Sequence, residues 1–178
     1  MPGPKTVAII MDGNRRWAKK NNLPIPSGHR KGIESLIEIV KTAKKSKIER
    51  LIVYAFSTEN WSRDNFEVNA LMNLINFGVD VKLNEIKENG IKLDFIGNLD
   101  DLPEKAQRGI DKCIRETKDL TELTLTVALN YGAISDILKA AKTINEKNIE
   151  LNEENFLKAT QIGEQEVDIF IRTGGDKR

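Results

Sequence analysis

Residues 7–18 read VAIIMDGNRRWA, so that five apolar residues end at an aspartate, a glycine and an asparagine. A short apolar run bounded by turn-forming residues is typical of a strand buried inside a sheet. Four further strand-like runs follow at 51–56, 91–96, 123–129 and 167–171, and segments with apolar residues at helical spacing lie between them. Alternating strands and helices predict an α/β fold whose central sheet is mostly parallel and flanked by helices.

The helical patterns indicate a single domain. One predicted helix begins at an N-cap at Ser27, and the others cover about 66–88, 103–118, 134–141 and 152–159. Because no repeat, low-complexity tract or linker interrupts this pattern, we expect one catalytic domain over residues 1–178. The chain stops directly after a glycine-rich strand end that a helix and a further strand would normally cover. We therefore expect the domain to be incomplete at its C-terminus.

The composition limits the class of protein. The chain has 178 residues, of which 39% are hydrophobic and 31% charged, and this balance is ordinary for a soluble globular domain. A net charge of +1 argues against a broad polyanion-binding surface, so we expect no nucleic-acid partner. The single cysteine, Cys113, excludes a disulfide framework, and no apolar run approaches the roughly 18 residues of a membrane span. These features predict a cytoplasmic protein.

Polar or glycine-containing segments follow four of the five predicted strands, at 12–17, 57–63, 130–132 and 172–178. In open α/β sheets, ligands bind outside the carboxyl ends of the strands. If the sheet is parallel, these four segments converge on one edge. That edge would carry a carboxylate, several arginines and exposed backbone amides.

These residue types suit a diphosphate site. A Mg²⁺ ion is held by one or two carboxylates together with phosphate oxygens, and Asp12 offers one carboxylate. Arginines bind phosphate oxygens in pairs, and glycines let the backbone approach an anion closely. The helix that we expect to begin near Ser27 would bring His29 to its N-terminus, which favours anions. Trp17 and Trp61 lie next to these polar groups and could form an apolar wall for a hydrocarbon chain. The arginine candidates are Arg16, Arg63, Arg172 and Arg178.

Each of these residues alone has a simpler structural interpretation. An aspartate after a strand is most often a turn or cap residue, a lone histidine is usually a surface or capping residue, and a glycine pair is usually a turn. The apolar stripe over 66–83 is typical of a core helix, and the wall of a lipid tunnel is the alternative. The functional case rests on the coincidence of these residues at one edge.

Other nucleotide and hydrolase motifs are absent. The sequence contains no P-loop, no Gly-x-Gly-x-x-Gly after the first strand and no Gly-x-Ser-x-Gly elbow. One cysteine and one histidine do not favour a zinc site.

Several blocks of the sequence occur in a familiar order. They are residues 7–18, Gly28-His29, residues 54–63 (YAFSTENWSR), Glu67-Val68, Asn130-Tyr-Gly132 and Ile171-Arg-Thr-Gly-Gly175. Together they resemble the signature blocks of the cis-prenyltransferase family, the isoprenyl transferases of the undecaprenyl diphosphate synthase type. The resemblance extends from Thr6 to Arg178, and it is specific because long blocks share both order and spacing. The Asp-Asp-x-x-Asp motif of the all-helical trans-prenyltransferases is absent.

The resemblance implies roles for individual positions. It places Asp12 at the Mg²⁺ ion as a catalytic residue and Asn60 at the proton-removal step. Because a neutral amide is not a competent base, we expect Asn60 to orient groups while Asp12 or the diphosphate takes the proton. The remaining positions are implied to bind substrate: Gly13, Asn14, Arg15, Arg16, Trp17, His29, Ser57, Thr58, Glu59, Trp61, Arg63, Glu67, Arg172 and Arg178.

The implied activity is the Mg²⁺-dependent condensation of isopentenyl diphosphate with an allylic diphosphate, first of all farnesyl diphosphate. The product would be a long-chain polyprenyl diphosphate such as the undecaprenyl lipid carrier. The resemblance also implies a homodimer, and the lipid product would bring the enzyme to the membrane surface. One departure is Ile25, where family members commonly have an arginine, and its loss predicts weaker binding of the allylic substrate.

Two alternatives stay open at this point. The first is a non-catalytic partner subunit of a cis-prenyltransferase complex, although the presence of Asp12 and Asn60 favours an enzyme. The second is a haloacid dehalogenase-like phosphatase, whose first strand also ends in an aspartate. That chemistry needs a second acid two residues later, where this chain has Asn14.

Overall fold

The computed structural model describes residues 3–175, apart from the side chains of residues 76 and 79–81. Five strands form one sheet in the order β3-β4-β2-β1-β5, and all four neighbouring pairs are parallel. This arrangement confirms the predicted α/β fold with a parallel central sheet. The strands are β1 (Thr6–Ile10), β2 (Arg50–Ser57), β3 (Ile91–Ile96), β4 (Leu123–Tyr131) and β5 (Ile169–Arg172).

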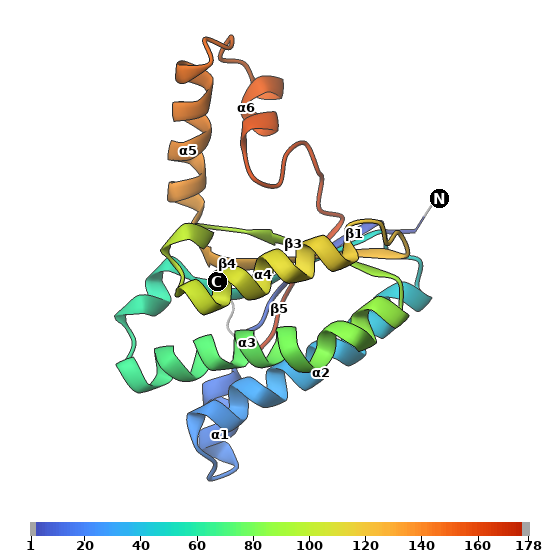
Figure 1. The fold of residues 1–178 in the computed structure, drawn as a ribbon, viewed down its shortest axis with the longest axis vertical. Helices are drawn as coiled ribbons and strands as arrows, with labels where there is room; N and C mark the ends of the chain where they lie inside the picture. The colour runs from blue at the N-terminus through green and yellow to red at the C-terminus, as the bar shows by residue number, and fades with distance from the viewer. Residues whose placement is uncertain (1–2, 176–178) are drawn as a thin grey trace.

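Three of the helices cover one face of the sheet, and two others stand away from it (Figure 1). The covering helices are α2 (Ile25–Lys45), α3 (Asn65–Glu88) and α4 (Glu104–Thr117). The outlying pair is α5 (Ala133–Glu146) and α6 (Glu153–Ala159), and α1 (Asn14–Lys20) packs on α2. Two short 3₁₀ helices, η1 (Thr58–Ser62) and η2 (Leu99–Asp101), follow β2 and β3.

The main core lies between the sheet and the covering helices. Alternate residues of β1 and β2, such as Ile9 and Val53, point to this face, as the two-residue period of a strand requires. They pack with Val40 of α2, Leu83 of α3 and Cys113 of α4. The layered core fixes the strand ends relative to the helix starts, and this positions the site described below.

The start of α2 differs from our prediction. The helix begins at Ile25 after Pro24, and a second proline, Pro26, lies in the first turn, where a missing N–H costs nothing. Ser27 is therefore inside the helix, and its N–H donates to the Pro24 carbonyl at 3.0 Å. The predicted N-cap at Ser27 was wrong. His29 consequently lies in the second turn, where it is buried, instead of at an exposed helix N-terminus.

Candidate active site

The carboxyl ends of β1, β2, β4 and β5 meet at one edge of the sheet, as predicted. Ile10 of β1 pairs with Tyr54 of β2 on one side and with Arg172 of β5 on the other. Ser57, at the end of β2, pairs with Tyr131 of β4. The four polar segments of the sequence therefore begin on neighbouring strands.

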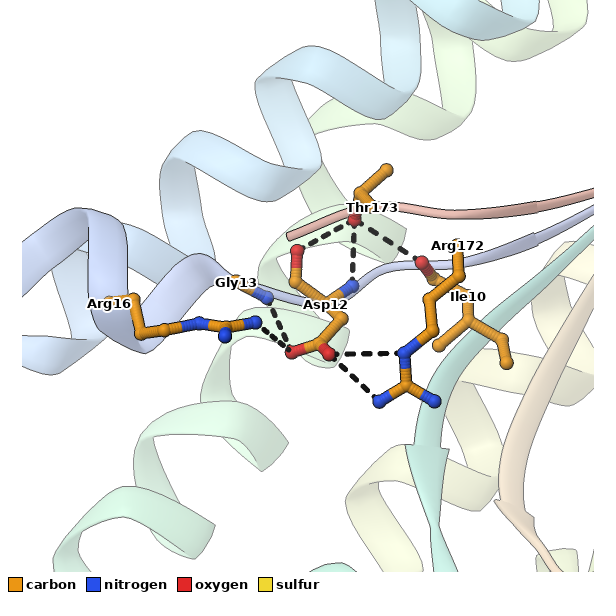
Figure 2. A network of polar contacts seen from close by, with 6 residues as sticks. All are labelled: Ile10, Asp12, Gly13, Arg16, Arg172 and Thr173. Atoms are coloured by element: carbon orange, nitrogen blue, oxygen red, sulfur yellow. Dashed lines mark hydrogen bonds and ion pairs between the residues drawn. The ribbon is translucent and has the colours of Figure 1, made fainter. Parts of the chain in front are cut away.

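The carboxylate of Asp12 is the centre of a polar network at this edge (Figure 2). Arg172 donates to its Oδ2 atom from Nη2 at 2.9 Å and from Nε at 3.3 Å. The backbone N–H of Gly13 donates to Oδ1 at 2.6 Å, and Nη2 of Arg16 lies 3.4 Å from the same oxygen. Three of the predicted site residues are thus gathered around the fourth.

This network keeps Asp12 ionised. Partial burial by itself raises the pKa of the Asp12 carboxyl, because desolvation disfavours the charged form. The hydrogen bonds from Arg172 and Gly13 and the charges of both arginines outweigh it, so the pKa lies below its usual value. Asp12 is therefore a carboxylate at neutral pH, as a Mg²⁺ ligand must be.

Thr173 and two glycines join the loop after β1 to the loop after β5. The Asp12 N–H donates to Thr173 Oγ1 at 2.8 Å, and that hydroxyl lies 2.6 Å from the Asp12 carbonyl oxygen (Figure 2). Gly13 has a φ of 96°, and a Cβ atom there would lie 2.9 Å from the Cα of Gly174. The two backbones therefore touch at a position that only glycine fits.

A second cluster surrounds Glu67, which is 4% exposed. Its Oε1 atom lies 3.2 Å from Nε2 of His29 and accepts a hydrogen bond from Arg63 Nη1 at 2.9 Å. Its Oε2 atom lies 3.5 Å from Nε of Arg15. One buried carboxylate thus holds two arginines and the only histidine of the chain next to the Asp12 network. Burial lowers the pKa of His29, and this outweighs the opposite effect of Glu67, so the imidazole is neutral at neutral pH.

The η1 segment carries the remaining predicted residues of the second strand end. Ser57 and Asn60 form a capping box in which the Ser57 N–H donates to Asn60 Oδ1 at 3.2 Å. The indole of Trp61 packs edge-on against Phe56, with ring centroids 5.0 Å apart. The carboxyl of Glu59 accepts hydrogen bonds from its own backbone N–H and from the side chains of Ser57 and Thr58. These bonds, that to its own N–H most of all, lower the pKa of Glu59.

A cavity of about 890 Å³ runs from this edge into the space between the sheet, α2 and α3. Its polar end includes Asp12, Arg16, Asn60 and Arg172, and its interior is mostly apolar. Among the residues that form the interior are Ile33, Leu36, Ile37, Val40, Leu71, Leu74, Ile75, Ile86, Leu93, Cys113, Leu125 and Val127. The apolar stripe of α3 is therefore both core and cavity wall.

Not every predicted residue lies on this cavity. Trp17 and Trp61 are each about two-fifths exposed and do not line it, so the expected tryptophan wall for a hydrocarbon chain is wrong. Aliphatic residues of α2 and α3 line the cavity instead. Thr58 and Glu59 also lie away from the lining. Arg178 lies outside the described residues 3–175.

The structure gives a packing role to Gly28, which the sequence indicated only as part of a signature block, and adds Gly32, which the sequence did not indicate. Gly28 and Gly32, one turn apart on α2, let the backbone and side chain of Asn14 pack directly on that helix. A Cβ atom on Gly32 would lie 2.7 Å from Asn14 Nδ2. The four-residue glycine spacing is the signal that could have indicated this contact, because residues four apart share one helix face.

No group of three or more histidine, cysteine, aspartate or glutamate side chains within residues 3–175 is arranged to hold a metal ion. A metal at this edge would thus rely on Asp12 and on oxygens from a ligand. None of the helices described in that range is long and apolar enough to cross a bilayer.

Comparison with known proteins agrees with this geometry. The Prenyltransf family model, which describes undecaprenyl diphosphate synthase, matches residues 10–178. The isoprenyl transferase of Clostridium perfringens is 39% identical, over 98% of this chain and 72% of the relative. That of Treponema denticola is 40% identical, over 98% of this chain and 78% of the relative.

Solved structures show the same fold. Lavandulyl diphosphate synthase from Lavandula x intermedia, in complex with dimethylallyl diphosphate, superimposes with a TM-score of 0.92 at 28% identity, covering 98% of this chain and 79% of that one. A probable undecaprenyl diphosphate synthase from Campylobacter jejuni gives a TM-score of 0.85 at 31% identity, covering 100% and 78%. The phosphatase alternative has no support here, and relatives named as transferases favour an enzyme over a non-catalytic subunit. The chain belongs to the undecaprenyl diphosphate synthase family and is a cis-prenyltransferase.

Proposed function

We propose that this enzyme condenses isopentenyl diphosphate with an allylic diphosphate, farnesyl diphosphate in the first cycle, to give a long-chain polyprenyl diphosphate of the undecaprenyl type. The observation that carries this proposal is the single cavity with two chemical ends. Its mouth holds Asp12, Arg16 and Arg172, which suit diphosphates, and its interior is apolar over most of its depth. A molecule with a charged head and a growing hydrocarbon tail matches both ends.

The allylic diphosphate is proposed to bind at residues 13–16. Gly13 has a positive φ and no side chain, so a ligand can approach the backbone there closely. The guanidinium of Arg16 lies next to Asp12. Arg172, on the neighbouring strand end, and Arg178 are proposed to bind isopentenyl diphosphate. The complex of lavandulyl diphosphate synthase with dimethylallyl diphosphate supports an allylic diphosphate as one of the two ligands.

Mg²⁺ is the proposed metal. In proteins this ion is usually held by one or two carboxylates and completes its shell with phosphate oxygens and water. The ionised carboxylate of Asp12 fits that pattern, because substrate oxygens would supply the other ligands. When bound, the ion would neutralise the charge that develops on the departing diphosphate.

The residues around it have complementary tasks. As the allylic C–O bond breaks, its electron pair leaves with the diphosphate, and Arg16 would stabilise that charge. The double bond of isopentenyl diphosphate attacks the allylic carbon, a C–C bond forms, and a proton leaves the adjacent carbon to give the new double bond. The low pKa of Asp12 makes it a weak base. The side-chain oxygen Oδ1 of Asn60 already accepts a hydrogen bond from the Ser57 N–H. We therefore assign proton uptake to the departing diphosphate and an orienting role to Asn60.

The remaining predicted residues are proposed to support this arrangement. Asn14 and Arg15 would complete the loop that binds the allylic diphosphate. Arg63, which bonds to Glu67 and lies between η1 and α3, would close over the substrate. We also propose substrate-binding roles for six further residues of these segments: Trp17, His29, Ser57, Thr58, Glu59 and Trp61.

A homodimer is also proposed, and α5 supports it. That helix leaves Ile134, Ile137 and Leu138 exposed on an arm that contacts α6 and stands off the sheet (Figure 1). Exposed apolar patches of this kind often mark protein interfaces. Sedimentation analysis of Ile137→Asp/Leu138→Asp tests this: a monomer is expected where the parent protein is dimeric, and an unchanged dimer would exclude this face. We further propose a cytoplasmic enzyme whose lipid product brings it to the membrane surface.

The condensation itself is tested with radiolabelled isopentenyl diphosphate, farnesyl diphosphate and Mg²⁺. We expect label in products that extract into organic solvent and, after removal of the phosphates, migrate as long-chain polyprenols with new cis double bonds. Labelled product confined to short chains would refute the long-chain assignment. Absence of incorporation would refute the proposed substrates.

A further inference from the structure

Asn130 stands out among the buried polar residues because its side chain and its backbone carbonyl bond to two neighbouring segments of the chain. It is 3% exposed and lies near the end of β4. Its side-chain Oδ1 accepts the indole N–H of Trp61 at 2.8 Å. Its side-chain Nδ2 donates to the carbonyl of Asn98 at 2.9 Å, and its own carbonyl accepts the Asn98 N–H at 3.0 Å.

The backbone of Asn130 has an uncommon conformation. Its φ is 50°, in the left-handed region that asparagine tolerates better than most residues. Two glycines allow the close packing around it. A Cβ atom on Gly97 would clash with the carbonyl of Leu129, and one on Gly132 would lie 2.6 Å from Thr58 Oγ1. Two residues at the end of β4 therefore contact η1: Asn130 bonds to Trp61, and Gly132 packs against Thr58.

The η1 segment and the residue that follows it include residues for which we propose catalytic and binding roles. Asn60 directly precedes Trp61 in the chain. The backbone N–H of Arg63 donates to the backbone carbonyl of Asn60 at 3.2 Å. Trp61 is about two-fifths exposed, although its ring packs against Phe56. The single N–H donor of its indole bonds to Asn130, and this bond ties η1 to the sheet across 69 residues of chain.

We infer that Asn130 is a positioning residue that fixes η1, and with it Asn60 and Arg63, over the mouth of the cavity. Its two side-chain groups have separate tasks: the carbonyl oxygen holds Trp61, and the amide nitrogen anchors that oxygen to the β3–η2 loop. Asn130 itself does not line the cavity, so it acts through η1 and not on the substrate. This inference deepens the proposed function and rests on it for the roles of Asn60 and Arg63.

The inference is tested with a double-mutant cycle of Asn130→Gly and Trp61→Phe. Glycine accepts the positive φ, so the first change removes the side chain without backbone strain. Phenylalanine keeps the ring against Phe56 and removes the indole donor. Each single variant is expected to lower kcat/KM for condensation about tenfold, since the buried hydrogen bond that holds η1 in place is lost. The double variant should fall no further than the worse single one, because both remove the same bond.

Two further measurements separate positioning from general destabilisation. Asn148→Gly is the matched control, because Asn148 has a φ of 51° near the end of α5 and lies outside the site. Its kcat/KM should equal that of the parent enzyme. In ¹⁵N spectra the indole N–H signal that Trp61→Phe removes should shift and exchange faster with solvent in Asn130→Gly, and should keep its slow exchange in Asn130→Asp, which retains the acceptor oxygen.

The possible failures are distinguishable. A parent enzyme without turnover would refute the proposed function, while the indole signal would still report on the Asn130 contact. Additive losses in the double variant, an unchanged indole signal in Asn130→Gly, or an equal loss in Asn148→Gly would each overturn the inference. If Asn130→Gly does not fold, unchanged kinetics of Trp61→Phe would overturn it as well.

Discussion

Asp12 and Arg172 are joined by two hydrogen bonds, of 2.9 and 3.3 Å, although 160 residues of chain separate them. Adjacent strands of the parallel sheet bring them together, because β5 pairs directly with β1. The guanidinium balances a carboxylate that would otherwise be a partly buried, uncompensated negative charge. Both groups line the mouth of the cavity, where we propose that the diphosphates bind.

Replacing Arg172 should therefore affect substrate binding and turnover together. We expect Arg172→Ala to reduce kcat/KM for isopentenyl diphosphate about 10²- to 10³-fold, since a preorganised donor to developing or bound charge is lost. Arg172→Lys should recover part of the loss, because a lysine keeps the charge without the planar fork. Steady-state kinetics with isopentenyl diphosphate as the varied substrate measure both effects. Equal kinetics for the parent and Arg172→Ala would remove Arg172 from the site.

Gly13→Ala should destabilise the fold itself. A left-handed backbone costs a residue with a Cβ atom about 1–2 kcal/mol, and the new methyl group would press on Gly174. We expect a loss of at least about 2 kcal/mol in the free energy of unfolding, measured in urea. Gly163→Ala is the control, because φ is 70° there and nothing lies within 4 Å of the added carbon. That variant should lose only the conformational cost, and similar losses in both would contradict the tight Gly13–Gly174 contact.

The stability of the protein should depend on pH through His29. Its pKa is lower in the folded protein than the ordinary value of 6.5, so the unfolded chain binds the proton more readily. The stabilisation is complete above pH 6.5 and is lost as pH falls through the folded-state pKa. The free energy of unfolding should thus decrease more steeply below pH 6.5 in the parent than in His29→Gln.

This comparison is clean because the chain has a single histidine. Glutamine can still donate to Glu67, so the variant removes titration more than it removes the contact. Parallel stability curves for the two proteins between pH 5 and 6.5 would show that His29 is not perturbed.

The far end of the cavity should limit product length. Lys41 of α2 lies 3.0 Å from Glu85 of α3, and Lys82 pairs with Glu85 at 2.9 Å, so these charged groups form part of the cavity lining. Lys41 lies about 18 Å from His29 along α2, at 1.5 Å per residue. A hydrocarbon chain that reaches this end would have to displace an ion pair. We expect Lys41→Ala/Glu85→Ala to give longer polyprenols, resolved by chromatography against standards, with little change in the rate of the first condensation.

Glu38→Ala is the matched control for that experiment. Glu38 also pairs with Lys41, at 3.2 Å, but it does not line the cavity. Its products should keep the parent lengths. The charge-swapped variant Lys41→Glu/Glu85→Lys should restore the parent lengths if the ion pair, and not side-chain bulk, closes the end. Unchanged lengths in the double alanine variant would place the limit elsewhere.

Part of this site follows from the sequence and part does not. The buried strand before Asp12 and the strand before Arg172 are local patterns, and parallel pairing then brings their ends together. Helix α1 was not predicted, because its seven residues carry four basic side chains and no apolar stripe. It packs on α2 through contacts at Gly28 and Gly32, which are tertiary and leave only a weak local signal.

The wall of the cavity shows a similar limit. Trp17 and Trp61 were candidates for an apolar wall around a hydrocarbon chain, because they lie next to polar site residues in the sequence. The bend of the chain into α1 and η1 turns both rings away from the interior. The contact between Trp61 and Asn130 could not be predicted either, since no local pattern links residues on different elements.

The most direct test of the account compares the parent enzyme with Asp12→Asn for incorporation of labelled isopentenyl diphosphate into polyprenyl products, with farnesyl diphosphate and Mg²⁺. Asparagine keeps the shape and removes the charge, so the fold should persist by circular dichroism. We predict that the parent is active and that chelation of Mg²⁺ abolishes its activity. We also predict that Asp12→Asn loses at least about 10³-fold in kcat, because the charge-stabilising metal site is lost. Incorporation by Asp12→Asn at the rate of the parent would contradict the central claim that Asp12 holds the metal at the reacting diphosphate.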